Sequence, residues 1–154
     1  VKTLPMEWRF RMDPKNEGRD MEAEGGHWAG RRQADHPDWK PIRVDAPWNR
    51  QGFDYHGAAW YRVRFDVPES VDADAAKWLL FNAVDGDAIV WLNGRIVGNR
   101  QDVPLHQVWD QPWAVETGGH LHPGESNRLV VQVVKESRDA GIWKPVELRV
   151  AEPD

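Results

Sequence analysis

The clearest hydrophobic pattern in the chain is an apolar stretch at residues 87–92, a two-residue turn, and a second stretch at residues 95–98. The turn is Asn93-Gly94, and both residues tolerate the positive φ that a type I′ turn needs. The pattern therefore predicts a β-hairpin. Both faces of its first strand are largely apolar, so we expect that strand in the interior of the fold, covered on each side.

Alternation of apolar and polar residues predicts further strands. At residues 7–13, Trp8, Phe10 and Met12 share one face, and residues 60–67 alternate in the same way. Residues 77–84 are apolar on both faces, which predicts one central strand. Shorter stretches predict strands at 41–44, 111–115, 128–135 and 146–150. Residues 13–38 and most of residues 99–122 are irregular. Eight or nine strands with almost no helix predict an all-β fold, an antiparallel β-sandwich or jelly roll.

The length of 154 residues is that of one domain, which we expect to span residues 1–154. The chain opens on Val1 without Met or a signal segment, so we expect it to be excised from a larger multidomain protein. Its formal net charge is −5, with no basic cluster along the sequence. No apolar run approaches the roughly 20 residues of a membrane helix. Neither nucleic acid nor membrane is therefore expected as a partner.

The chain has no cysteine, which excludes disulfides, thiolate chemistry and cysteine zinc sites. His120 and His122 would share one face of a strand, but two ligands are too few for a closed zinc site. We therefore expect no cofactor. A structural calcium ion stays open, because loops of this fold class often bind one through carboxylates and carbonyls, although no stretch has the pattern of a calcium loop.

Ten tryptophans are the most unusual feature of the composition. Four lie within predicted strands, where core packing is the better interpretation: Trp8, Trp60, Trp78 and Trp91. Trp60 and Trp91 lie opposite the cleaner apolar faces, so either of them is a candidate to cap an outer surface. Six lie on or beside predicted loops: Trp28, Trp39, Trp48, Trp109, Trp113 and Trp143. A loop tryptophan can anchor its loop to the sandwich, or it can stack on the C–H face of a sugar.

Polar side chains that suit sugar hydroxyls accompany aromatic residues in three loops. The first loop supplies Arg50, Gln51, Asp54, Tyr55 and His56. The second supplies Arg100, Gln101 and Trp109, and the third supplies Asp139 followed by Trp143. Loops at the same end of a jelly roll cluster, so we predict a carbohydrate-binding site where these ten residues converge.

Several stretches together resemble the sugar-binding domain of glycoside hydrolase family 2. Residues 57–68, GAAWYRVRFDVP, resemble its strand G-x-A-W-Y-R-x-x-F-x-V-P. Residues 81–86 and 91–98 are similar to its next block, and residues 123–131, PGESNRLVV, match its turn and strand P-G-x-N-x-L-x-V. Residues 140–148, AGIWKPVEL, are similar to its closing G-G-I-W-x-P-V-x-L, and residues 8–18 and 39–48 fit its opening segment. The chain departs from the family pattern at residues 114–120.

This resemblance implies a galactose-binding-domain-like jelly roll attached to a larger enzyme. In that family the catalytic carboxylates lie on a separate barrel of about 250 residues, which this chain is too short to contain. The chain is therefore expected not to be an enzyme by itself. We expect a non-catalytic carbohydrate-binding module of a glycoside hydrolase or related polysaccharide-degrading protein. Its expected partners are an oligo- or polysaccharide and the catalytic domain, and its expected location is periplasmic or extracellular.

Two alternatives stay open at this stage. The chain can be a structural scaffold that packs against a catalytic domain and has no sugar site of its own. It can also be a protein–protein adhesion module, because sandwiches serve many functions. An exposed ring beside convergent polar groups would favour sugar binding over both.

Overall fold

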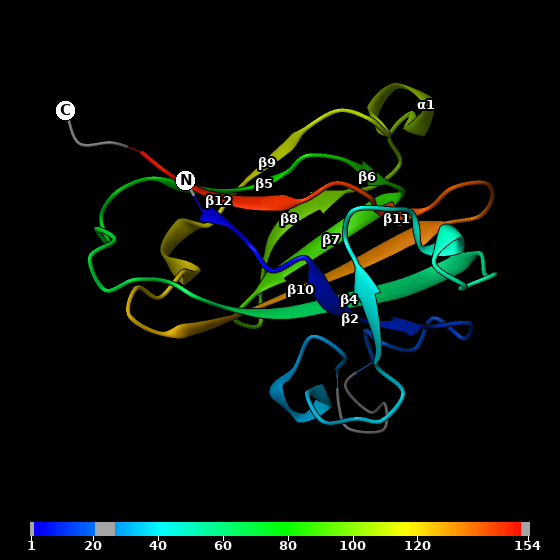
Figure 1. The fold of residues 1–154 in the computed structure, drawn as a ribbon, viewed down its shortest axis with the longest axis horizontal. Coiled ribbons are helices and arrows are strands. Elements are labelled where there is room, and N and C mark those ends of the chain that lie inside the picture. The colour runs from blue at the N-terminus through cyan, green and yellow to red at the C-terminus, as the bar shows by residue number, and fades with distance from the viewer. Residues whose placement is uncertain (1, 21–26, 152–154) are drawn as a thin grey trace.

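The computed structural model describes residues 2–20 and 27–151, and they form two antiparallel sheets packed face to face (Figure 1). The smaller sheet has the strand order β1 (Lys2–Thr3), β12 (Val146–Val150), β5 (Lys77–Phe81) and β9 (Trp113–Glu116). The larger sheet has the order β3 (Lys40–Arg43), β2 (Glu7–Met12), β4 (Gly57–Asp66), β10 (Ser126–Lys135), β7 (Asp87–Leu92) and β8 (Arg95–Arg100). The predicted all-β jelly roll is confirmed.

Short elements complete the fold: a two-stranded sheet of β6 (Val84–Asp85) and β11 (Gly141–Ile142), one helical turn α1 (Leu105–Val108), and 3-10 turns η1 (Arg31–Gln33), η2 (Trp48–Arg50) and η3 (Gly118–His120). The continuous strand predicted for residues 77–84 is wrong. The chain leaves β5 after Phe81, and Asn82 Nδ2 donates to the carbonyl of Pro145 at 2.7 Å, so that β6 can pair with β11 instead of extending the sheet. None of the helices described is long and apolar enough to cross a bilayer.

The hairpin of β7 and β8 forms as predicted. Asn93 and Gly94 have φ values of 50° and 86° at the turn, which only residues tolerant of positive φ adopt easily. Strand β7 lies between β10 and β8, and residues 88–92 are buried on both of its faces. The apolar pattern of residues 87–92 thus reflects an interior strand with cover on each side.

The main core fills the space between the two sheets, and Tyr61 lies at its centre without solvent exposure. Its hydroxyl accepts a hydrogen bond from the backbone N–H of Ile142 at 3.1 Å. Burial raises the pKa of Tyr61, because a phenolate would lie without solvent. Gly141 has a φ of +102°, and a Cβ there would lie 2.1 Å from the Tyr61 hydroxyl. A glycine is therefore required where β11 crosses this ring.

A second apolar cluster covers the outer face of the larger sheet. Trp60 from β4 and Trp91 from β7 stack there, with ring centroids 5.0 Å apart. Trp28 and Trp39 pack over them from the irregular segment that follows β2, which forms the lobe below β2 and β4 in Figure 1. Asp13 begins this segment, and its carboxylate accepts the Trp60 indole N–H at 2.9 Å. Trp60 and Trp91 thus lie on the outer face of the sheet but are buried beneath the lobe, which the two loop tryptophans anchor.

Candidate functional site

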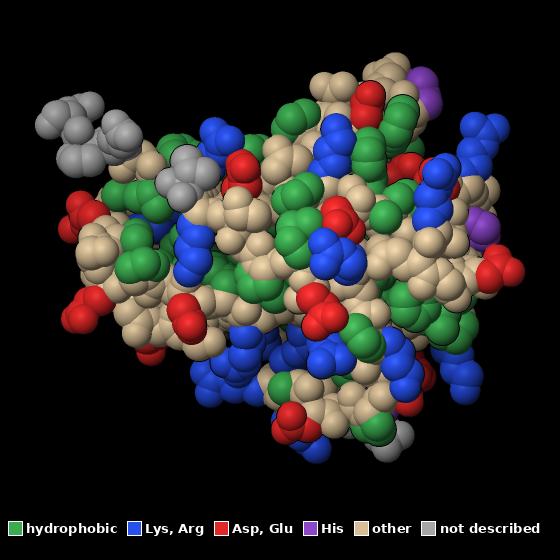
Figure 2. All heavy atoms as spheres, in the orientation of Figure 1, with side chains coloured by type: hydrophobic (Ala, Val, Ile, Leu, Met, Phe, Trp, Pro, Cys, Tyr) green, Lys and Arg blue, Asp and Glu red, His purple; other side chains and the backbone are tan. Residues whose placement is uncertain are grey.

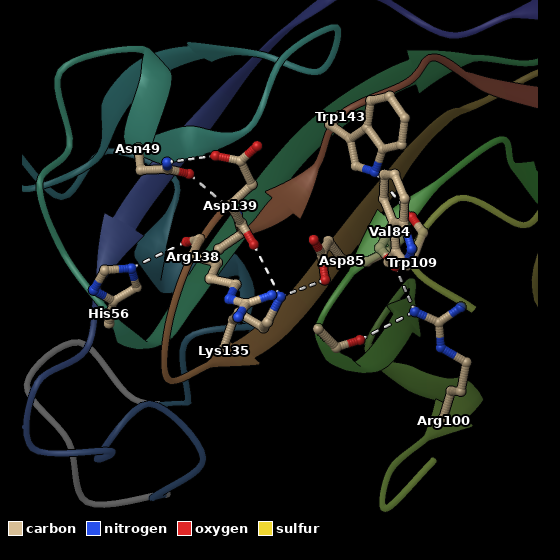
Figure 3. Close-up of polar contacts among 12 residues, drawn as sticks. Asn49, His56, Val84, Asp85, Arg100, Trp109, Lys135, Arg138, Asp139 and Trp143 are labelled. Carbon is tan, nitrogen blue, oxygen red and sulfur yellow. Dashed lines mark hydrogen bonds and ion pairs between the residues drawn. The ribbon is translucent and has the colours of Figure 1, made fainter. Parts of the chain in front are cut away.

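The three loops predicted to carry the site meet at one end of the sandwich. They line an open cavity of about 840 Å³, and a smaller hollow of about 370 Å³ adjoins it. Asp85, Trp109 and Asp139 line both, so we call the two together the groove. Figure 3 shows its main side chains, which come from the loop before β4, from β6, from the ends of β8 and β10, and from the segments that follow α1, β10 and β11.

Asp139 joins the first loop to the third (Figure 3). Its carboxylate accepts hydrogen bonds from Asn49 Nδ2 at 2.8 Å and from Arg50 Nη2 at 2.8 Å. Asn49 Oδ1 in turn accepts the backbone N–H of Ala140 at 3.1 Å. The hydrogen bonds from Arg50 and then Asn49 lower the pKa of Asp139 below its usual value. This exposed network fixes the loop geometry and keeps the Asp139 carboxylate ionised.

The floor of the groove carries an ion pair. Lys135 Nζ lies 2.6 Å from Asp85 Oδ1, and the two side chains are 13% and 9% exposed. Lys135 also donates to the carbonyl of Asp139 at 3.0 Å. Arg100 Nη2 donates to the carbonyls of Val84 and Gly86, at 2.7 and 3.0 Å, which flank Asp85 in the chain. The floor is therefore polar and held in one arrangement by bonds to backbone on either side.

One wall of the groove is aromatic. The rings of Trp109 and Trp143 stack with centroids 5.6 Å apart and an interplanar angle of 22°. Trp143 Nε1 donates to the carbonyl of Trp109 at 2.9 Å, which holds the pair in register. Trp109 comes directly after α1 and is 42% exposed. A partly exposed indole backed by a second indole is a firm flat surface beside the polar floor.

Six of the ten predicted residues line the groove: Arg50, Asp54, His56, Trp109, Asp139 and Trp143. His56 Nε2 lies 3.0 Å from the carbonyl of Arg138, which brings the first and third loops together at a second point. The structure thus gathers side chains that are up to 93 residues apart in sequence, from Arg50 to Trp143. Their binding of a ligand stays a prediction.

The other four predicted residues lie outside this lining. The Gln51 amide donates to the carbonyls of Arg43 and Ala46 and so braces its own loop. The Tyr55 hydroxyl donates to the carbonyl of Ala58 at 2.8 Å. Arg100 is behind the floor, with its guanidinium over the Trp113 ring, and burial lowers its pKa. Gln101 is exposed beside it.

Asn49, Ser137 and Arg138, polar residues of the same loops outside the ten selected, also line the groove. So do four residues that sequence reasoning did not consider for the site: Asp85, Leu105, His106 and Lys135. Asp85 and Lys135 carried a signal that could have been used. Each is a charged residue at the end of an otherwise apolar segment, and such residues are seldom buried unless paired.

The described residues, 2–20 and 27–151, contain no group of three or more His, Cys, Asp or Glu side chains placed to hold a metal ion. His122 lies 3.6 Å from Glu125, and the carbonyl of His120 accepts from Asn93.

No family model matches the chain. A curated β-glucuronidase from Paenibacillus borealis is 29% identical over 138 residues, which are 86% of this chain and 21% of that protein. The apo structure of the Ruminococcus gnavus β-glucuronidase superposes with a TM-score of 0.77 at 18% identity, covering 97% of this chain and 28% of that one. The same enzyme in complex with D-glucuronic acid gives a TM-score of 0.77, with 97% and 29% covered.

Sequence and structural neighbours of this chain are therefore β-glucuronidases, which belong to glycoside hydrolase family 2. The chain spans about a fifth of the curated relative and under a third of the solved enzyme. The structural likeness, at 18% identity, shows a shared fold.

Proposed function

We propose that this chain is a non-catalytic carbohydrate-binding domain of a glycoside hydrolase. The observation that carries the proposal is the exposed indole of Trp109, stacked on Trp143 at the wall of a groove with a polar floor. The C–H face of a pyranose packs against such a ring, and its hydroxyls need partners that both donate and accept. Asp54, His56 and Arg138 offer those partners around the same cavity.

The expected binding is weak and reversible. Dissociation constants between millimolar and micromolar correspond to about −4 to −8 kcal/mol, which one stacked ring and a few hydrogen bonds supply. The bonds of Asp139 with Asn49 and Arg50 already hold the loops in place. Less ordering is then needed when a sugar binds, which favours affinity.

The share of the relatives that the chain covers supports an accessory role. The chain matches 21% of a β-glucuronidase, and a catalytic barrel of about 250 residues needs more chain than this. We propose a catalytic domain of the parent protein and an oligo- or polysaccharide as the partners, and a periplasmic or extracellular location. Nucleic acid and membrane are not among the proposed partners.

A scaffold role is the second candidate. The observation that favours it is again the small share of the relatives that this chain spans, because a domain within a larger enzyme packs against its neighbours. In that case Trp109 and Trp143 would contact protein instead of sugar.

A binding screen separates the two. The purified chain is tested against a panel of oligo- and polysaccharides, and each hit is titrated by calorimetry with Trp109→Ala and with the control Ile96→Ala, which removes another exposed apolar side chain. We expect saturable binding that Trp109→Ala weakens by about 10-fold, the loss of about 1.4 kcal/mol from one stacked ring, and that Ile96→Ala leaves unchanged. No binding across the panel would contradict sugar recognition and favour the scaffold.

A further inference from the structure

The outer face of the larger sheet carries a second notable surface beside the tryptophan cluster. Arg62 and Arg64 are two residues apart on β4 and so share a face. Arg128 on β10 lies directly opposite Arg64, and Arg9 on β2 lies opposite Arg62. Arg31 approaches from η1 in the lobe. Figure 2 shows Lys and Arg side chains gathered where this lobe meets the sheet. We call these five residues the arginine face.

The arginine face is a product of the fold. Its members come from β2, η1, β4 and β10, and no run of basic residues in the sequence indicates it. The chain as a whole has a net charge of −5. Like charges held close together repel one another, so a group of arginines attracts anions even on a protein with a negative net charge.

The guanidinium groups contact neutral acceptors. Arg62 Nη1 donates to the carbonyl of Trp28 at 3.1 Å, and Arg128 Nε donates to the carbonyl of Ala29 at 3.0 Å. Within residues 2–20 and 27–151 none of the five forms an ion pair. Arg62 and Arg128 are 5% and 7% exposed, at the inner edge of the arginine face, and Arg62 Nη2 has no hydrogen-bond partner. Arg64 donates to Ser126 Oγ at 3.4 Å. A buried N–H donor that has no acceptor lowers the stability of the folded state.

The charges also act on one another. The pKa of Arg62 is lowered to about 10, mainly by burial and then by the neighbouring charges of Arg128 and Arg64, while Asp35 opposes them. Burial, and then Arg31 and Arg64, lower the pKa of Arg128. A native state that holds these like charges together is less stable than one in which an anion lies between them.

We propose that the arginine face binds a tetrahedral oxyanion, namely a sulfate or phosphate group. Guanidinium forks match the oxygens of such groups bidentately. A carboxylate offers two oxygens, whereas a sulfate or phosphate group offers at least three acceptor oxygens to donors that come from three strands and one 3-10 turn. The group can be a free ion or an ester on a saccharide. This site is separate from the groove and does not depend on the function proposed for it.

Thermal unfolding of the chain tests the site. Sodium sulfate or sodium phosphate is added at low millimolar concentration, with sodium chloride at equal ionic strength as the reference. We expect a saturable rise in Tm of about 3–5 °C at a tenfold excess over Kd. Arg64→Gln should abolish the rise without lowering the Tm of the anion-free protein, because it relieves repulsion. The control Arg149→Gln, which removes an exposed arginine paired with Glu147, should keep the rise.

Arg64→Lys separates a built site from diffuse attraction. It keeps the charge and removes the planar fork, so we expect sulfate to bind it about 10-fold more weakly. Equal responses of wild type, Arg64→Gln and Arg64→Lys would overturn the proposal, since they indicate a general salt effect.

Polymers identify the source of the group. If sulfated dextran binds, Arg64→Gln weakens that binding, and neutral dextran does not bind, the recognised group is an ester carried by a saccharide. A response to free sulfate or phosphate alone assigns a free ion, and both results support the oxyanion site. Polygalacturonate that binds as tightly as sulfated dextran would overturn the preference for a tetrahedral oxyanion over a carboxylate.

Discussion

The ion pair of Asp85 and Lys135 gives a sharp prediction for stability. Its atoms are 2.6 Å apart, and the side chains are 9% and 13% exposed, so water screens the attraction weakly. Removing one partner leaves the other charge desolvated and uncompensated, which costs about 3–5 kcal/mol for a buried pair. Because both side chains retain slight exposure, we expect Asp85→Asn and Lys135→Met each to lower the free energy of unfolding by about 3 kcal/mol.

A double-mutant cycle measured by urea denaturation tests this reasoning. The double variant leaves neither charge buried, so it should be more stable than the sum of the two single losses predicts, with a coupling of about 2 kcal/mol. The exposed pair of Arg149 and Glu147, 2.9 Å apart with 51% and 23% exposure, is the control, and its removal should cost below about 1 kcal/mol. The reasoning would be refuted if each single substitution cost as little stability as removal of the control pair, or if the losses of the two single variants added up fully in the double variant.

Two further predictions concern single residues. Gly141→Ala should lower the free energy of unfolding by about 3 kcal/mol or more, because its Cβ would lie 2.1 Å from the Tyr61 hydroxyl at a φ of +102°. Thermal denaturation measures this loss, and the control Gly119→Ala, with open space around it, should leave the stability unchanged. Equal effects of the two substitutions would contradict the close approach. His27 accepts the N–H of Ala29 through Nδ1 at 3.0 Å, and burial lowers its pKa below the ordinary value of about 6.5. The unfolded chain therefore binds more protons than the folded chain below pH 6.5. The stabilisation that neutral His27 gives the folded state is fully present above pH 6.5 and is lost as the pH falls through the pKa of His27 in the folded state. The Tm of wild type should fall more steeply below pH 6.5 than that of His27→Gln, and parallel pH profiles would exclude this role.

Much of the fold was predictable, because strands with one buried face impose a period of two on the sequence. The strand at residues 7–12 and the Asn93-Gly94 hairpin were predicted close to their observed bounds. The helical turn α1 was not predicted. It has four residues, which is too few to show a helical period. The break after Phe81 was missed because a bond from Asn82 to the distant Pro145 sets it.

The site was predictable only in part. The loop positions of Arg50, Trp109 and Asp139 could be found from residue type, whereas their convergence depends on how the loops fold. Asp85 and Lys135 are 50 residues apart in sequence and meet through strand pairing. The arginine face arises in the same way, because Arg64 and Arg128 become neighbours only through the register of β4 and β10. Local patterns carry no information about such long-range register.

The most direct test of the carbohydrate-binding claim is ¹⁹F NMR of the chain labelled with 5-fluorotryptophan, titrated with the best ligand of the sugar screen. Ten tryptophans give up to ten signals, and Trp109→Phe and Trp143→Phe assign the pair at the groove. The account predicts saturable shifts of the Trp109 signal and, through stacking, of the Trp143 signal, while the buried signals of Trp60 and Trp91 stay in place. Shifts confined to other tryptophans, or none at saturating sugar, would contradict it.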